Sequence, residues 1–136
     1  MSFIEIDGLG DDYEDKPVPE GEYLLRVTNI QERTAKDGKS PQIMVMLKVE
    51  DSDYPDSATI FNYLTFPNGE DDAEKRRTKM RMNTRFLKAF GVPFEKKGFN
   101  AEDIVGCEAT LLVTQSEFPE GSGIMKNDLN LPPVAE

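Results

Sequence analysis

A two-residue alternation of apolar and polar side chains recurs along most of this chain, and it predicts a mainly β protein. The clearest run is residues 42–50, in which every second side chain is aliphatic. Polar turns at residues 36–41 and 51–57 separate the first three runs. Five strands are therefore predicted, at residues 21–31, 42–50, 58–66, 107–117 and 123–131.

The two faces of the predicted strands differ in chemistry. The aliphatic face is expected to point into a core, because burying aliphatic side chains drives folding. The opposite face carries cations, rings and thioethers, which a merely solvated strand rarely needs. In the alternative register, Phe61 and Tyr63 are core residues while Ile60 and Leu64 point outward. The residues expected to point outward are Arg26, Thr28, Met44, Met46, Lys48, Phe61 and Tyr63.

A helix is predicted between the third and fourth strands, and Gly91 ends it. At 100° per residue its apolar side chains share one arc, and four cations share the opposite side. Lys75, Arg76 and Lys79 fall near the apolar arc, so the first turn extends beyond the core or the helix starts near Thr78. The apolar arc holds Met80, Met82, Phe86, Leu87, Ala89 and Phe90, and the cationic stripe holds Arg77, Arg81, Arg85 and Lys88.

Positive charge is concentrated in one part of an acidic chain. The net charge is -10, yet residues 73–97 hold nine Lys and Arg residues against two acids. The same stretch carries Phe86, Phe90 and Phe94. Cations neutralise phosphates and ring faces stack on bases, so this combination favours a surface for a single nucleic-acid strand. A solvated helix face is the alternative explanation of the stripe.

The order of the elements favours one known architecture. Three strands joined by short turns, then a helix, then two strands is the order of a five-stranded OB-type barrel. Its helix, between strands 3 and 4, closes one end of the barrel, and its outward strand face binds oligonucleotides. The predicted organisation is a flexible acidic segment at residues 1–19, an OB-fold nucleic-acid-binding domain at residues 20–131 and a short tail at residues 132–136.

The acidic segment at residues 1–19 is read as mobile, with Phe3, Ile4 and Ile6 as candidate anchors. It is expected to be a solvated tail. The alternative is a segment that imitates a nucleic-acid strand and covers the basic surface, or that docks a partner. This second role supports the competing hypothesis of a protein-interaction module or a DNA-mimic inhibitor. A structural virion component is disfavoured because no assembly segment is evident.

Several classes of function are excluded by composition. The chain has no histidine, which removes Ser-His-Asp, Cys-His and HExxH chemistry and makes a zinc site unexpected. Its single cysteine, Cys107, is expected to be a buried, inert thiol and points to an intracellular compartment. No apolar run approaches the ~20 residues of a membrane span. Residues 1–15 are acidic where a signal peptide would be basic.

Two patterns of acidic residues resemble known metal sites. Asp56 and the run at residues 95–97 resemble the acid and Glu-x-Lys pattern of metal-dependent nucleases, but they are far apart and Glu95 falls in a predicted loop. Asp51, Asp53 and Asp56 resemble a calcium loop that lacks its Gly and terminal Glu. We therefore expect no catalysis, no cofactor and no metal.

Short motifs recur in a fixed order along the chain. They are a Gly-x-Tyr strand start, a Lys-x-Gly turn, a Lys-Val-Glu-Asp strand end, an aromatic strand and an Arg-Phe-Leu-x-x-x-Gly helix end. They stand at Gly21 and Tyr23, Lys36 and Gly38, Lys48–Asp51, Phe61 and Tyr63, and Arg85–Gly91. In these motifs residues 21–131 resemble a family of small bacteriophage proteins of the single-stranded DNA-binding type.

This resemblance implies an OB-type fold and the coating of single strands during phage DNA replication or recombination in the host cytoplasm, without catalysis. Such proteins often end in an acidic tail that recruits replication enzymes. This chain ends in NLPPVAE, so its acidic segment is the candidate for binding phage or host replication and recombination proteins. The sequence leaves the oligomeric state open, with a homo-oligomer among the alternatives. The expected DNA contacts are Arg26, Met44, Met46, Lys48, Phe61, Tyr63, Arg77, Arg81, Arg85 and Lys88.

Overall fold

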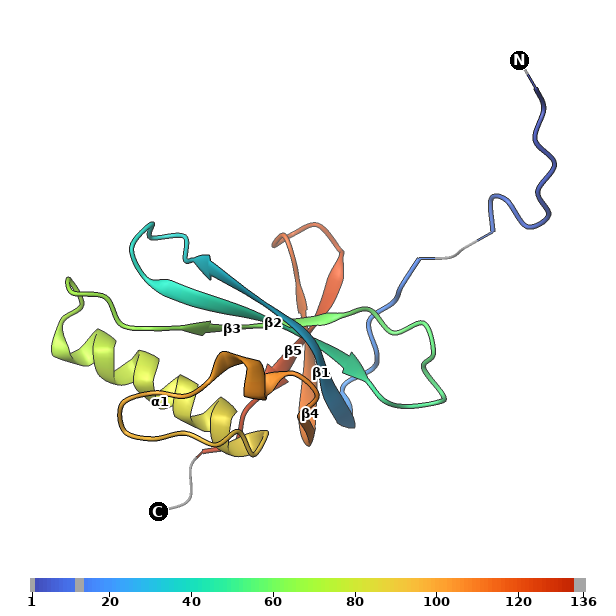
Figure 1. Ribbon diagram of the computed structural model, residues 1–136. Coiled ribbons are helices and arrows are strands. Elements are labelled where there is room, and N and C mark those ends of the chain that lie inside the picture. Colours follow the sequence, from blue (N-terminus) through green and yellow to red (C-terminus); the bar gives the residue numbers. More distant parts are fainter. Residues whose placement is uncertain (1, 12–13, 134–136) are drawn as a thin grey trace.

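The computed structural model describes residues 2–11 and 14–133, which form one five-stranded antiparallel sheet and one α-helix (Figure 1). The sheet order is β3-β2-β1-β4-β5. A single-turn 3₁₀ helix, Ala101–Ile104, precedes β4. The bounds are β1 Gly21–Thr34, β2 Pro41–Val49, β3 Ile60–Thr65, α1 Ala73–Ala89, β4 Glu108–Glu117 and β5 Met125–Asn130. The five predicted strands and the helix between the third and fourth are thus confirmed.

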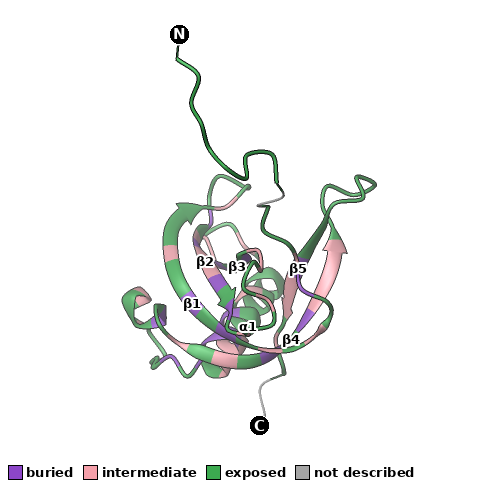
Figure 2. Ribbon diagram, turned by 90° about the vertical axis from the view of Figure 1, so that its right-hand side faces the viewer, coloured by how far each residue is buried: buried purple, intermediate pink, exposed green. Residues whose placement is uncertain are grey.

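The sheet curls into a half-barrel because β1 is long enough to serve two neighbours. Its first half pairs with β4, and its second half pairs with β2. A register irregularity between Val27 and Asn29 marks a bulge, which bends a strand and increases its twist. In Figure 2 the strands trace an arc from β2 through β1 to β4 and β5. The two edge strands, β3 and β5, are brought into contact without forming a ladder.

Residues 16–18 fill the seam between these two edges. On the β3 side, the Lys16 N–H donates to the Asp56 carbonyl at 2.9 Å, and the Ala58 N–H donates to the Lys16 carbonyl at 2.8 Å. On the β5 side, the Val18 N–H donates to Asn127 Oδ1 at 2.8 Å. Val18 is only 1% exposed. The acidic segment was expected to run to residue 19, but its last residues belong to the barrel.

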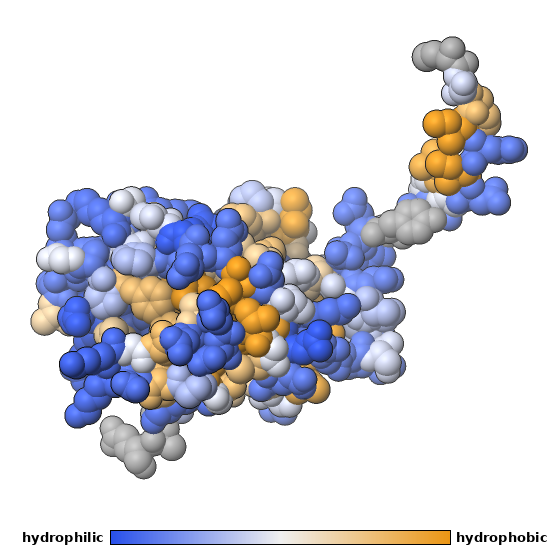
Figure 3. Space-filling view, viewed as in Figure 1, coloured by the Kyte–Doolittle hydropathy of each residue, from blue (hydrophilic) through white to orange (hydrophobic). Residues whose placement is uncertain are grey.

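Residues 2–11, which we call the arm, extend away from the barrel (Figure 1). Figure 3 shows hydrophobic side chains gathered on it. Phe3 is 94% exposed, and Ile4 and Ile6 are also exposed, so the expected anchors are not buried against the described part of the chain. Within the arm, the Asp11 N–H donates to the Gly8 carbonyl at 3.1 Å.

The helix packs by a narrower arc than its wheel predicts. Phe86 and Phe90 are buried and stack with ring centroids 4.6 Å apart. Asn83 is also buried and donates from Nδ2 to the Thr65 carbonyl at 3.1 Å. Met80 and Met82, which were predicted to pack, are exposed at the two edges of this arc. Asn83 lies at the centre of this arc although it is polar, because its side-chain amide bonds the Thr65 carbonyl of β3.

The helix starts at Ala73, earlier than the alternative start near Thr78 that the sequence allowed. The Asp72 carboxylate accepts a hydrogen bond from the Lys75 N–H at 2.8 Å and caps the helix before Ala73. A start near Thr78 is therefore wrong, and the first turn does extend beyond the core. Among the helices of the described residues, none has the length and apolar character needed to cross a bilayer.

Candidate nucleic-acid interface

Two aromatic side chains stand out from β3 on the convex face of the sheet. Phe61 is 46% exposed and Tyr63 is 49% exposed, while Ile60 and Leu64 between and beside them are buried. The outward placement of the rings is confirmed, and the alternative register is wrong. A half-exposed ring loses little solvation when it contacts another flat surface. Phe61 and Tyr63 are therefore available to stack on bases.

These rings form the floor of a groove of about 820 Å³. One wall comes from the end of β1 and the turn that follows it, and the other comes from the β4–β5 hairpin. Both hairpins rise on the same side of the sheet in Figure 1. We call this the ring groove, and its main lining residues are Arg33, Gln42, Phe61, Tyr63, Phe118 and Lys126.

Each wall of the ring groove carries a cation beside a ring. The Arg33 guanidinium carbon lies 5.9 Å from the Tyr63 centroid, and its Nη1 lies 3.9 Å from the Met44 sulfur. Across the groove, Lys126 Nζ lies 5.5 Å from the Phe118 centroid. Both distances are within cation–π range. A positive charge and a flat hydrophobic face are therefore presented together on both sides of one groove.

Lys126 also pairs with Asp128, with Nζ 3.0 Å from Oδ1. Lys126 is half-exposed and Asp128 is about one third exposed, and ion pairs open to solvent contribute little. Lys126 can therefore exchange this carboxylate for a phosphate at small cost. Lys36, also exposed, lies on the rim of the same groove.

Two carboxylates, those of Asp15 and Asp37, also line the ring groove. Asp37 is committed to the β1–β2 turn, because its Oδ1 accepts the N–H groups of Lys39 and Ser40 at 2.8 Å each. The Ser40 hydroxyl donates to its Oδ2 at 2.5 Å. That hydroxyl, followed by the two N–H groups, lowers the Asp37 pKa from 3.8 to about 2. Its negative charge is thus engaged by the turn.

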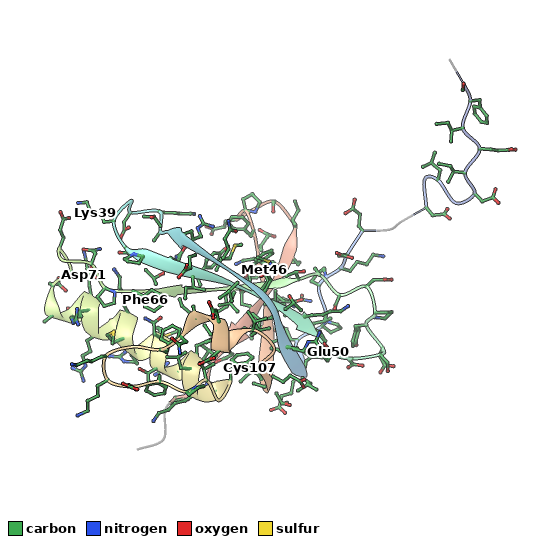
Figure 4. All side chains as sticks on the ribbon, in the orientation of Figure 1. Lys39, Met46, Glu50, Phe66, Asp71 and Cys107 are labelled. Atoms are coloured by element: carbon green, nitrogen blue, oxygen red, sulfur yellow. The ribbon has the colours of Figure 1, made fainter. Side chains whose placement is uncertain are left out.

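A polar network fixes this turn to the helix. The buried Ser40 hydroxyl accepts from Lys79 Nζ at 2.9 Å and from Asn68 Nδ2 at 2.7 Å. Lys79 also pairs with Asp71 at 2.7 Å, and its hydrogen bond is the main cause of the lowered Asp71 pKa. Lys39 forms an ion pair with Glu70 at the same corner, where Figure 4 labels Lys39 and Asp71. The groove wall formed by the turn is therefore held in place by α1.

Of the other predicted strand residues, the two methionines lie beside the rings and the two cations do not. Met44 and Met46 are half-buried between β1 and β3, opposite Tyr63 and Phe61 in register. Arg26 on β1 and Lys48 on β2 lie opposite each other in the strand register, at the end of these strands away from the β1–β2 turn. Neither of these cations lines the ring groove. Arg26 Nε also lies 3.4 Å from a Glu50 carboxylate oxygen, near the Glu50 label of Figure 4.

The cationic stripe of α1 does not join the ring groove. Arg77, Arg81 and Lys88 are exposed and Arg85 is half-buried, and none of the four lines the groove. The first turns of α1 contact the β1–β2 turn through Lys79, which does not belong to the stripe. The structure thus brings Phe61 and Tyr63 together with Arg33 and Lys126, and it places the predicted helix cations on a separate surface.

Sequence reasoning missed Arg33, Phe118 and Lys126. The first strand was expected to end at Gln31, which left Arg33 outside it, and Phe118 follows the predicted fourth strand. The predicted fold could have pointed to these three residues, because the first and last hairpins of an OB-type barrel flank its binding face. Cations and rings near those two turns were therefore candidates.

The residues weighed for metal chemistry form no such site. Within residues 2–11 and 14–133, no group of three or more Cys, Asp or Glu side chains is placed to hold a metal ion. Asp51 accepts the Asp53 N–H at 2.9 Å and so closes its own turn. The thiol of Cys107, labelled in Figure 4, is half-buried and lies 3.1 Å from the Asp103 carbonyl, so it is less buried than expected.

Comparison with known proteins gives one finding. Residues 10–122, which include β1 to β4 and α1, match the family model described as Protein of unknown function (DUF669). No curated protein matches the chain.

Proposed function

We propose that this chain, which belongs to the DUF669 family of proteins of unknown function, is a non-catalytic protein that binds single-stranded DNA with little sequence preference. It would act in bacteriophage DNA replication or recombination in the host cytoplasm. The half-barrel, its strand order and the contact between β3 and β5 fit an OB-type barrel. The resemblance to phage single-stranded DNA-binding proteins supports the same assignment.

The observation that carries the proposal is the ring groove itself. Exposed Phe61 and Tyr63 share one open groove with Arg33, which lies over Tyr63, and with Lys126, which lies over Phe118. Unpaired bases would stack on the rings, and the phosphates between them would meet Arg33, Lys36 and Lys126. The bases of a duplex are already stacked on each other and cannot lie flat on these rings. The groove therefore favours single strands.

The acidic remainder of the molecule fits this role. A net charge of -10 repels polyanions from most of the surface, so productive contact is restricted to the groove. Stacking and phosphate contacts read no base edges, which is why we expect little sequence preference.

A second candidate is a protein-interaction module acting through the arm, which is favoured by the exposure of Phe3 and Ile4.

The test is fluorescence anisotropy with labelled oligo-dT, a duplex of equal length and an RNA strand. We expect oligo-dT to bind more tightly than the duplex. Replacing Phe61 and Tyr63 by Ala should weaken oligo-dT binding by at least about 30-fold, since each stacked base is worth ~1–3 kcal/mol. The matched control replaces Leu24 and Leu112 by Ala. These two side chains lie outside the groove and are exposed about as much as the two rings, so this variant should bind oligo-dT as the parent does.

Three results would contradict the proposal. They are absence of oligo-dT binding at low salt, equal binding of duplex and single strand, and unchanged binding by the Phe61→Ala/Tyr63→Ala variant. Circular dichroism of both variants separates loss of a contact from loss of the fold. A protein that ignores all three nucleic acids but retains its fold would favour the interaction module.

A further inference from the structure

The cationic stripe of α1 has no partner in the described structure. Arg77, Arg81 and Lys88 point away from the buried arc, and no ion pair within residues 2–11 and 14–133 includes them. The only acid on α1 is Glu74, in its first turn. Met80 and Met82 are exposed on the two flanks of this face. The helix thus presents concentrated positive charge bordered by apolar side chains.

The arm has the complementary composition. Its ten residues include three carboxylates, Glu5, Asp7 and Asp11, and no cation. Between the carboxylates stand Ile6 and Leu9, of which Leu9 is 81% exposed. An isolated exposed apolar side chain needs no explanation, but four large ones within seven residues form an apolar surface that the described part of the chain leaves exposed.

The two surfaces also agree in length. From Arg77 to Lys88 the helix rises about 17 Å, at 1.5 Å per residue. From Glu5 to Asp11 an extended chain spans about 20 Å, at roughly 3.3 Å per residue. Extension would open the hydrogen bond from the Asp11 N–H to the Gly8 carbonyl. An extended arm can therefore place its carboxylates along the whole stripe.

The position of the arm rules against docking within one molecule. Lys16 is fixed in the β3–β5 seam, and the arm leaves from the end of the barrel opposite to α1 (Figure 1). A second copy has no such restriction. We propose that the arm of one copy docks along the cationic stripe of another. Because the two contacting surfaces are different, the contact is head-to-tail and continues from copy to copy.

This inference does not depend on the proposed function, and it is tested without nucleic acid. Sedimentation velocity of the full chain, from about 5 to 200 µM, is compared at about 50 mM and about 500 mM salt, because screening weakens exposed charge pairs. We expect association that grows with protein concentration at low salt and disappears at high salt. A chain that stays monomeric throughout at low salt would overturn the proposal.

Charge reversal locates the contact. The Arg77→Glu/Arg81→Glu and Asp7→Lys/Asp11→Lys variants should each associate at least about fivefold more weakly. Combining all four substitutions restores opposite charges and the parental net charge of -10, so it should restore the parental affinity. The control Lys96→Glu/Lys97→Glu changes charge by the same amount off the stripe and should associate as the parent does.

Other occupants give distinguishable outcomes that would each overturn the proposal. If the arm docks into the ring groove, Phe61→Ala/Tyr63→Ala abolishes the association and the stripe variants leave it unchanged. If the stripe binds only nucleic acid, the parent is monomeric and Arg77→Glu/Arg81→Glu weakens oligo-dT binding instead. Failure of the fourfold variant to recover association also contradicts a direct contact between arm and stripe.

Discussion

The salt dependence of DNA binding decides which of the two cationic surfaces contacts the strand. Releasing counterions from single-stranded DNA gives a slope of log affinity against log salt of about -0.7 per neutralised phosphate. The ring groove offers three cations, Arg33, Lys36 and Lys126. Its slope is therefore about -2, and affinity should fall about 20-fold between roughly 50 and 200 mM salt.

A strand that also crosses the cationic stripe meets four more cations. The slope then steepens to about -5, and the same change in salt weakens binding about 900-fold. Fluorescence anisotropy with labelled oligo-dT at four or more salt concentrations separates these cases easily. We expect the shallower value, because none of the four stripe cations lines the ring groove.

Single substitutions refine the assignment. Lys126→Gln should reduce the slope to about -1.4, which leaves about a sevenfold loss over the same range. Arg81→Gln, the matched change on the stripe, should leave the slope unchanged. The reasoning is refuted by a slope near -5 in the parent or by a slope that responds to Arg81 and not to Lys126.

Two further predictions concern stability, measured by urea denaturation. Asp37→Asn should destabilise the protein at neutral pH, and because the folded-state pKa is lowered from 3.8 to about 2, the difference should shrink as pH falls from about 4 to 2; a constant difference would contradict it. Val18→Ala should cost about 2 kcal/mol, through lost burial and the cavity left behind, whereas Ile4→Ala on the exposed arm should change stability by less than ~0.5 kcal/mol. Equal effects of the two substitutions would place residue 18 outside the core.

The strand pattern was predictable because a two-residue period directly reports which side chains share a face. Ile43, Val45 and Leu47 are buried as expected, and Phe61 and Tyr63 are exposed as expected. Both results follow from local alternation alone. The same argument correctly placed Arg77, Arg81 and Lys88 on the solvent side of the helix.

Features that depend on the curl of the sheet were not predictable in this way. Arg33 and Lys126 belong to hairpins far apart in sequence, and they line one groove because the sheet curls. Val18 follows a proline in an acidic segment without any period, so nothing local marks it as buried. Met82 shows the limit of a helical wheel, which gives the angle of a side chain but not the width of the contact.

The short segment at residues 16–18 has a consequence for the solubility of the whole chain. Strands at the border of a sheet carry unpaired N–H and C=O groups, which recruit strands of other molecules into aggregates. In this fold both borders, β3 and β5, meet at the seam that Lys16 and Val18 occupy. These three residues bond the segment that leads into β3 and the Asn127 side chain of β5, so a cleavage that removes them would open this seam to pairing with strands of other molecules.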